Sequence, residues 1–229
     1  MVRKLDAKHK TGDPCNMNST SIIVKQGLPF IIPLGILTFI FLYLGILWIS
    51  ALFFLATIFV IFFFRNPERN SLQEINVIVS PADGKVIKIE DVMGNDLLHE
   101  PSKKISIFMN VFNVHVNRIP CSGKVDAIRY REGKFISANL DKASSLNEKN
   151  SILITTDNGK KILTEQIAGL IARRIECWLE EGIHVNKGDR FGLIRFGSRL
   201  DLFLPTDTAL SVSIGDKVRA GETPIGWLK

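Results

Sequence analysis

The chain has 229 residues, 46% of them hydrophobic, which is enough for a well-buried core in one large or two small domains. Its formal net charge of +6 is divided evenly: residues 1–64 hold five Lys and Arg against two Asp and Glu, and residues 65–229 hold 24 against 21. Because this charge forms no dense basic stripe with interleaved aromatic residues, it argues against a nucleic-acid partner. It suits an anionic membrane surface better, or simply a mildly basic soluble face.

The cysteines do not suggest an oxidising compartment or a metal centre. Cys15, Cys121 and Cys177 are odd in number, far apart, and match no paired metal-ligand spacing. The histidines show no ligand spacing either, so no metal site is expected. We expect reduced thiols and a catalytic part that faces the cytoplasm, with a cysteine nucleophile as the alternative.

A long uncharged segment follows a polar N-terminal tail at residues 1–27. Residues 28–64 contain no Asp, Glu, Lys, Arg or His in 37 positions and hold nine of the fifteen phenylalanines. About 20 helical residues cross the roughly 30 Å core of a bilayer, so this length predicts a hairpin of two short helices. Gly45 marks the expected bend, between Tyr43 and Trp48, whose amphipathic rings suit a membrane interface.

The flanks of this segment favour a membrane hairpin with both ends in the cytoplasm. Lys25 precedes it and Arg65 and Arg69 follow it, in keeping with the positive-inside tendency. A secretory signal peptide is one alternative, but its apolar stretch is usually about 7–15 residues and ends in a small-residue cleavage site. A buried core hairpin is the other, and it would need more partner surface than a domain of this size supplies.

The remainder, residues 65–229, predicts a mainly β (α+β) globular domain with barrel-like or sandwich-like strand-turn units. Short β-branched or alternating runs are separated by turn residues. Residues 165–179 carry apolar positions at helical spacing but also β-branched residues, so a helix or strands are both open there. The strand candidates are residues 77–79, 86–89, 105–112, 124–130, 152–155, 161–163, 190–196 and 200–204, with 152–155 and 161–163 forming a hairpin.

Two turns repeat the same pattern. V-N-K-G-D-R at residues 185–190 and V-S-I-G-D-K at residues 212–217 both read V-x-x-G-D-[K/R]. Gly supplies an unusual φ there, and Asp can accept hydrogen bonds from nearby backbone amides. Related strand-turn units are expected at both places, and not a solenoid.

Gly197-Ser198 lies between two of the strand candidates and has the order that internal pyruvoyl formation requires. An unhindered carbonyl donor must precede a serine whose hydroxyl attacks it, and glycine tolerates the strained backbone that such an attack needs. β-Elimination of the resulting ester then leaves a group that hydrolyses to pyruvoyl. The dipeptide alone carries no specificity, and serine needs a nearby base.

His115 is the histidine that stands out as such a base. It lies within an apolar run that we expect to be a strand, with polar neighbours close by, whereas His9 and His99 lie in polar stretches and His184 precedes a Gly-Asp turn. A packed core histidine is the alternative for His115. Asp83 precedes a glycine, where ordinary turn chemistry is the alternative to a catalytic role.

Four ordered motifs together resemble the short, single-domain form of the phosphatidylserine decarboxylase family. They are F-R-N-P-E-R at residues 64–69, S-P-A-D-G-K-V at 80–86, F-N-V-H-V-N-R-I-P at 112–120, and R-F-G-S-R-L-D at 195–201. The likeness extends from about residue 28 to the C-terminus and includes the hydrophobic segment.

The resemblance implies a zymogen that cuts itself between Gly197 and Ser198 into a β chain, 1–197, and an α chain, 198–229, which stay associated. Ser198 becomes a covalent pyruvoyl group, and neither pyridoxal phosphate nor a metal is needed. Its ketone forms a Schiff base with phosphatidylserine and accepts electrons as CO₂ leaves, giving phosphatidylethanolamine. The resemblance assigns His115 to decarboxylation and Asp83 to self-cleavage.

One position departs from the family. Longer members have a second histidine three residues beyond the one that matches His115, and Arg118 stands in that place. Arginine stays protonated and cannot act as a general base. Either His115 serves both reactions, or Asp83 and the local backbone suffice for processing. Arg118, Arg199 and Arg65 are candidate contacts for the lipid phosphate or carboxylate.

Other functions stay open. A membrane-tethered carrier of the biotinyl or lipoyl type would fit the two V-x-x-G-D-[K/R] turns, but it needs a lysine at a hairpin tip beside Met or Ala, which we do not find. A pyruvoyl decarboxylase of a soluble amino acid and a membrane-anchored structural protein are further alternatives. The expected partner is phosphatidylserine in the cytoplasmic membrane. A homo-oligomer is open.

Overall fold

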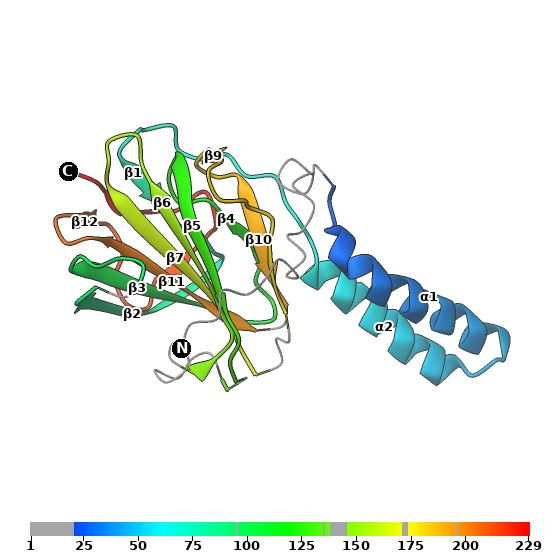
Figure 1. Ribbon diagram of the computed structural model, residues 1–229. Coiled ribbons are helices and arrows are strands. Elements are labelled where there is room, and N and C mark those ends of the chain that lie inside the picture. Colours follow the sequence, from blue (N-terminus) through cyan, green and yellow to red (C-terminus); the bar gives the residue numbers. More distant parts are fainter. Residues whose placement is uncertain (1–20, 95, 135, 138–145, 171–173, 196) are drawn as a thin grey trace.

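The computed structural model describes residues 21–94, 96–134, 136–137, 146–170, 174–195 and 197–229 (Figure 1). These ranges leave out most of the expected polar tail, including His9 and Cys15. They also leave out Phe196. A helical hairpin projects from one side of a mainly β domain (Figure 1). The predicted fold class is confirmed.

The hairpin consists of α1 (Leu28–Tyr43) and α2 (Leu47–Phe63), preceded by the 3₁₀ turn η2 (Lys25–Gly27). Pro29 lies in the first turn of α1, where its missing N–H removes no intrahelical hydrogen bond. The bend falls at the expected place, and Gly45 adopts φ 72° there, a left-handed conformation that glycine reaches without steric cost.

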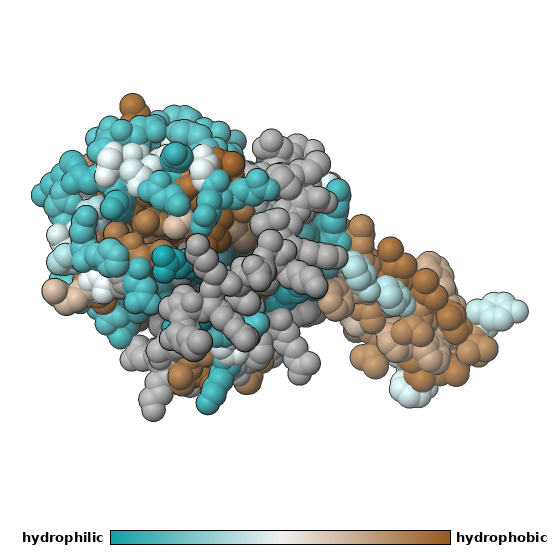
Figure 2. All heavy atoms as spheres, viewed as in Figure 1, coloured by the Kyte–Doolittle hydropathy of each residue, from teal (hydrophilic) through white to brown (hydrophobic). Residues whose placement is uncertain are grey.

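The hairpin is exposed along its length, and Figure 2 shows its hydrophobic surface beside the largely polar surface of the β domain. No residue of α1, all of which is described, is buried. The alternative of a buried core hairpin is therefore wrong. By length and composition alone, the helical stretch Lys25–Tyr43 is apolar enough to cross a membrane, and α2 is a shorter apolar helix.

The two helices hold each other through a few specific contacts. The rings of Phe41 and Phe53 stack with centroids 5.4 Å apart. The Ser50 hydroxyl donates to the carbonyl of Thr38 at 2.9 Å, so this polar group is satisfied within the hairpin.

Short antiparallel strands build the β domain. They are β1 (Val77–Val79), β2 (Gly84–Val92), β3 (Ser102–Met109), β4 (Val116–Arg118), β5 (Gly123–Arg131), β6 (Lys149–Thr155), β7 (Lys161–Ala168), β8 (Ile175–Cys177), β9 (His184–Val185), β10 (Arg190–Ile194), β11 (Ser198–Pro205), β12 (Ala209–Leu210), β13 (Lys217–Val218) and β14 (Pro224–Trp227).

In the described residues these strands form one curled eight-stranded sheet and two three-stranded sheets. The large sheet has the order β13-β2-β3-β11-β7-β6-β5-β9, and the small sheets are β4-β10-β8 and β1-β14-β12. β11 lies between β3 and β7, near the middle of the large sheet. Leu200 and Leu202 of β11 pack in the core with Ile107 of β3, Ala168 of β7 and Ile194 of β10.

The structure settles one question that the sequence left open and corrects one expectation. Residues 165–179 form no helix where they are described, because β7 runs to Ala168 and β8 follows at Ile175, so β-branched propensity outweighs the helical spacing. His115 lies in the loop just before β4, not within a strand.

The expected turns are confirmed. β6 and β7 pair as a hairpin, with Ile152 opposite Thr164. In the two V-x-x-G-D-[K/R] turns, Gly188 and Gly215 have φ of 88° and 104°. The carboxylates of Asp189 and Asp216 accept hydrogen bonds from the backbone N–H three residues earlier, at 3.0 and 2.8 Å.

Candidate active site

Gly197 and Ser198 lie where the chain crosses from one sheet to another. β10 ends at Ile194 in the three-stranded sheet β4-β10-β8, and β11 begins at Ser198 in the eight-stranded sheet. Gly197 has φ 72°, and no described atom lies within 4 Å of the place that a Cβ would occupy. The glycine is thus required by backbone conformation and not by crowding.

The Ser198 side chain is completely buried and faces the core. Its residue pairs with Met109 on β3 and with Ala168 on β7, so the three side chains share one face of the sheet. Among the described residues, its Oγ atom has no hydrogen-bond partner. A buried hydroxyl without a partner is unfavourable, which makes it a candidate for a reactive group.

The His115 imidazole lies beside this segment and is fully buried. Its Nδ1 lies 3.0 Å from the carbonyl oxygen of Asn113, which can only accept, so Nδ1 carries the proton. Nε2 then presents its lone pair and accepts a long hydrogen bond from the Gly197 N–H at 3.4 Å. Asn113 is itself held, because its side-chain oxygen accepts from the Asn110 N–H at 2.9 Å.

The imidazole is neutral at physiological pH. Burial lowers the pKa of His115 to about 4, the hydrogen bond to Asn113 opposes this change, and the positive charge of Arg65 adds to it. A neutral imidazole whose unprotonated Nε2 accepts only the long bond from Gly197 can take up a proton, which is what a general base requires.

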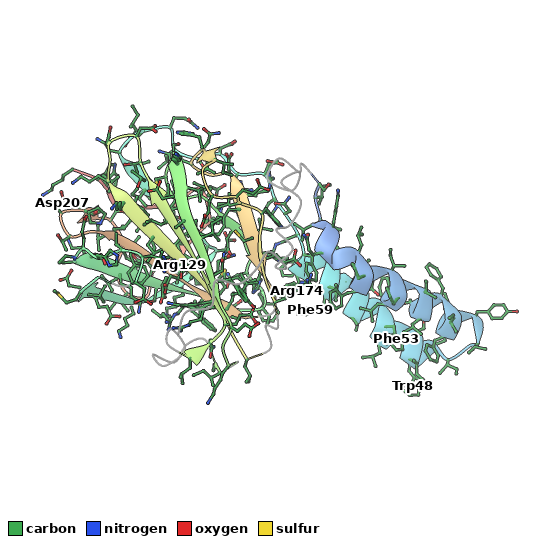
Figure 3. All side chains as sticks on the ribbon, viewed as in Figure 1. Trp48, Phe53, Phe59, Arg129, Arg174 and Asp207 are labelled. Carbon is green, nitrogen blue, oxygen red and sulfur yellow. The ribbon has the colours of Figure 1, made fainter. Side chains whose placement is uncertain are left out.

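The root of the hairpin forms a wall of the candidate site. Phe63, the last residue of α2, packs its ring on that of His115 with centroids 4.2 Å apart, and Phe64 packs edge-on against Phe63 at 5.0 Å. Both phenylalanines are fully buried in a cluster that includes Trp178. Figure 3 places Phe59 near the β domain, whereas Trp48 lies on the projecting part. Sequence reasoning missed this role of Phe63, although the apolar run ends there.

Asp83 lies at the same end of the large sheet but is not in contact with Ser198. It precedes β2, and β3 separates β2 from β11, which places the two backbones on the order of 10 Å apart. Its carboxylate accepts from the Ala220 N–H at 2.7 Å and pairs with Arg69 at 3.1 Å. The structure brings His115 and Ser198 together and leaves Asp83 at the edge of the site.

Arg118 and Arg65 use their guanidinium groups to hold backbone carbonyls. Arg118 is buried and donates to Gly188 at 2.7 Å and to Pro67 at 2.8 Å, and burial lowers its pKa to about 10. Arg65 donates to the carbonyl of Phe62 at 2.7 Å and to that of Phe112 at 2.8 Å. Both guanidinium groups thus hold backbone carbonyls in this structure, and their contact with the lipid stays a prediction.

Arg199 faces away from the reactive side of its strand. Successive side chains alternate across a strand, so Arg199 lies on the opposite face of the sheet from Ser198. There it is buried in an ion pair with Asp201, with the Nε to Oδ1 distance 2.9 Å, and Lys104 lies 3.4 Å from the same carboxylate. The expected contact between Arg199 and substrate does not follow from this geometry.

The described residues contain no group of three or more His, Cys, Asp or Glu side chains placed to hold a metal ion. Within this part of the chain, both cysteines are free thiols, and burial raises the pKa of the Cys121 thiol to about 12. That thiol is therefore a poor nucleophile, which argues against the cysteine alternative at this position.

Comparison with known proteins decides the family. A family profile described as phosphatidylserine decarboxylase matches residues 56–226. The chain belongs to the phosphatidylserine decarboxylase family. The likeness to this family inferred from the four motifs is confirmed, and the chain is a decarboxylase, a carboxy-lyase.

Several relatives match this chain along nearly its whole length, and each is named phosphatidylserine decarboxylase proenzyme. The protein from Syntrophus aciditrophicus is 54% identical over 211 residues, which cover 92% of this chain and 99% of that relative. The protein from Desulfotalea psychrophila is 53% identical, covering 90% and 96%. The protein from Magnetococcus marinus is 44% identical, covering 93% and 98%.

Proposed function

We propose that the chain is the precursor of a pyruvoyl-dependent enzyme that converts phosphatidylserine to phosphatidylethanolamine and CO₂. The pyruvoyl group would come from Ser198 after self-cleavage of the Gly197-Ser198 bond. One observation carries the proposal: the unpartnered, buried Oγ of Ser198 follows a left-handed glycine, with the imidazole of His115 beside it. The residues present fit the formation of this group.

The cleavage needs two steps in the chain itself. Ser198 Oγ attacks the Gly197 carbonyl carbon, the C–N bond breaks, and the hydroxyl proton ends on the freed amine, so an ester replaces the amide. Loss of the Ser198 Cα proton then breaks the Cβ–Oγ bond, and its electron pair leaves with the Gly197 carboxylate. One water hydrolyses the remaining imine and releases ammonia, leaving the ketone. We assign the proton transfers to His115, whose neutral Nε2 adjoins Gly197.

The location of the bond supports an association of the two fragments, 1–197 and 198–229, after cleavage. The bond lies between two sheets, so cutting it breaks no strand pairing. β11 stays paired with β3 from Ser198 opposite Met109 to Pro205 opposite Ser102, and with β7 on its other side. The small fragment also keeps β13 on β2 and β14 on β1.

In the mature enzyme the same imidazole would serve the second reaction. The pyruvoyl ketone would supply an electrophile for the substrate amine and an acceptor for the electrons that the loss of CO₂ leaves behind. His115 would hold and return the proton that replaces CO₂, because Phe63 and burial keep water from its ring. Asp83 would act at a distance, as the negative charge that balances Arg69, Arg65 and Arg118 at this end of the sheet.

The hairpin would hold the enzyme in the cytoplasmic membrane, with the β domain on the cytoplasmic side. Helices of 16 and 17 residues extend about 25 Å, close to the roughly 30 Å apolar core of a bilayer. The candidate site lies at the root of this hairpin, where a diacyl substrate would meet it. Phe112 is 63% exposed there and lies edge-on to Phe59, which extends the apolar surface onto the β domain.

Intact-mass analysis of the purified chain, together with release of CO₂ from phosphatidylserine, tests the proposal. The wild type should yield two fragments that meet at 197/198, the smaller one lacking a free amine, and Ser198→Ala should yield one inactive chain. Ser106→Ala is the matched control, because Ser106 is also a buried serine without a hydrogen-bond partner for Oγ, on the neighbouring strand β3. An uncut wild-type chain that releases CO₂ would overturn the pyruvoyl mechanism.

A further inference from the structure

Three buried amide side chains form a hydrogen-bonded chain across the core beside Ser198. The Asn150 Nδ2 donates to the Gln166 Oε1 at 3.0 Å, and the Gln166 Nε2 donates to the Asn117 Oδ1 at 2.9 Å. All three are at most 3% exposed. Burying an amide side chain among Ile, Leu and Val costs free energy unless its polar atoms have hydrogen-bond partners. The three amides supply such partners for one another.

The backbone makes room for the row. Asn117 and Cys177 pair with Gly192 from either side in the three-stranded sheet, and Gln166 belongs to the facing large sheet. A Cβ at Gly192 would lie 2.9 Å from the Gln166 Nε2. Glycine at this position thus lets the Gln166 amide lie between the two sheets.

At the Asn117 end of the row, the amide nitrogen has only a weak hydrogen-bond acceptor. The Asn117 Nδ2 points at the Met109 Sδ, 3.6 Å away, and a thioether sulfur accepts hydrogen bonds poorly. The Asn117 oxygen is the acceptor for Gln166, so the Asn117 nitrogen is the atom that faces Met109. Met109 is the residue directly opposite Ser198 on β3, where paired Cβ atoms lie about 5 Å apart.

We infer that Asn117 is a further catalytic residue of self-cleavage, whose amide turns from Met109 to donate a hydrogen bond to Ser198 Oγ as that oxygen attacks Gly197. The Asn117 amide donates only to the sulfur of Met109, and Met109 stands opposite Ser198, whose buried hydroxyl oxygen lacks a partner among the described residues. The bond stabilises the negative charge on Oγ as it loses its proton to attack Gly197. It stabilises the same oxygen again when that oxygen leaves as part of the Gly197 carboxylate. Gln166 orients the amide and is a positioning residue.

This inference rests on the proposed self-cleavage, and the rate of that cleavage tests it. Asn117→Leu removes the donor at similar volume, and the appearance of the two fragments is followed by intact mass after synthesis of the full chain. Loss of one such donor lowers rates on the order of 100-fold in other enzymes, and a similar slowing is expected here. Asn150→Leu is the matched control, since it removes an amide from the same row without touching Met109, and should stay within a few-fold of wild type.

Two further measurements distinguish a catalytic role of Asn117 from a loss of folding in the variant. The melting temperatures of both variants in a Ser198→Ala chain show whether the core still folds. If Asn117→Leu does not fold, Asn117→Asp replaces it, because at pH 8 the carboxylate keeps the acceptor for Gln166 but has no proton to donate. Cleavage of the folded Asn117 variant at the wild-type rate, or equal slowing by Asn150→Leu, overturns the role of Asn117 and leaves self-cleavage standing. An uncut wild type overturns self-cleavage itself.

Discussion

The ring of Phe63 lies 4.2 Å from that of His115, so the end of the apolar hairpin and the candidate catalytic imidazole share one contact. Phe63 belongs to a buried cluster with Val60 and Trp178, which joins α2 to the sheet β4-β10-β8. Burial is the largest cause of the low pKa of His115. The end of the hairpin therefore contributes to the burial that keeps this imidazole neutral.

Phe63→Ala should raise the pKa of His115 from about 4 towards its ordinary value of about 6.5. Removing the ring opens space for water, and a hydrated imidazole is protonated more easily. The imidazole NMR titration of His115 in an uncut Ser198→Ala chain measures this. Phe53→Ala is the control, because Phe53 lies on the projecting part of α2 and stacks on Phe41 (Figure 3). An unchanged titration in Phe63→Ala would contradict the coupling.

The free energy of unfolding should decrease at acid pH, because the folded chain binds a proton at His115 less readily than the unfolded chain does. Its folded pKa of about 4 lies below the unfolded value of about 6.5, so between these values the unfolded chain binds a proton that the folded chain does not. The free energy of unfolding should thus decrease as pH falls from about 6.5 to about 4, by about 3 kcal/mol from this residue. Melting temperatures of the Ser198→Ala chain with and without His115→Asn measure the difference. Parallel curves for the two chains would contradict it.

Much of this fold could be predicted because its signals are local. An uncharged run interrupted at Gly45 predicts a hairpin from length alone, and the Gly-Asp turns follow from backbone preferences of single residues. The contacts that complete the site could not be predicted in this way. Phe63 at the end of α2 meets His115 in a distant loop, and Asn117 meets Gln166 from a strand of another sheet, so both contacts depend on the tertiary fold. Periodicity also placed His115 in a strand, whereas side-chain hydrogen bonds of Asn110 shape a loop there.

Arg118, which stands where longer family members have a histidine, should contribute to the stability of the folded chain. Arg118→Lys keeps the charge, but one ammonium group cannot hold the carbonyls of Pro67 and Gly188 together as the planar fork does. One buried carbonyl then loses its donor, at a cost of about 1–3 kcal/mol. Melting of the Ser198→Ala chain measures the loss. Arg219→Lys is the control, because its side chain is 73% exposed and the change should stay within about 0.5 kcal/mol.

Phe112 should matter only when the substrate is in a bilayer. It lies at the tip of the loop that ends in Asn113 and His115, and its edge faces Phe59 of α2. Phe112→Asp puts a negative charge where an apolar ring would enter an anionic membrane surface, which costs apolar burial of about 1.5–3 kcal/mol. We expect KM for phosphatidylserine in vesicles to rise about tenfold or more, since 1.4 kcal/mol is a factor of ten.

A substrate below its micelle concentration separates this membrane effect from damage to the site. Short-chain phosphatidylserine in solution needs no interfacial contact, so Phe112→Asp should turn it over at nearly the wild-type rate. Ile75→Asp controls for a charge on an exposed apolar position, because Ile75 is 85% exposed and lines a hollow with Asp157 and Asn158 at the tip of the β6-β7 hairpin, away from Ser198. Equal losses on both substrates would mean that Phe112 shapes the His115 loop and does not touch lipid.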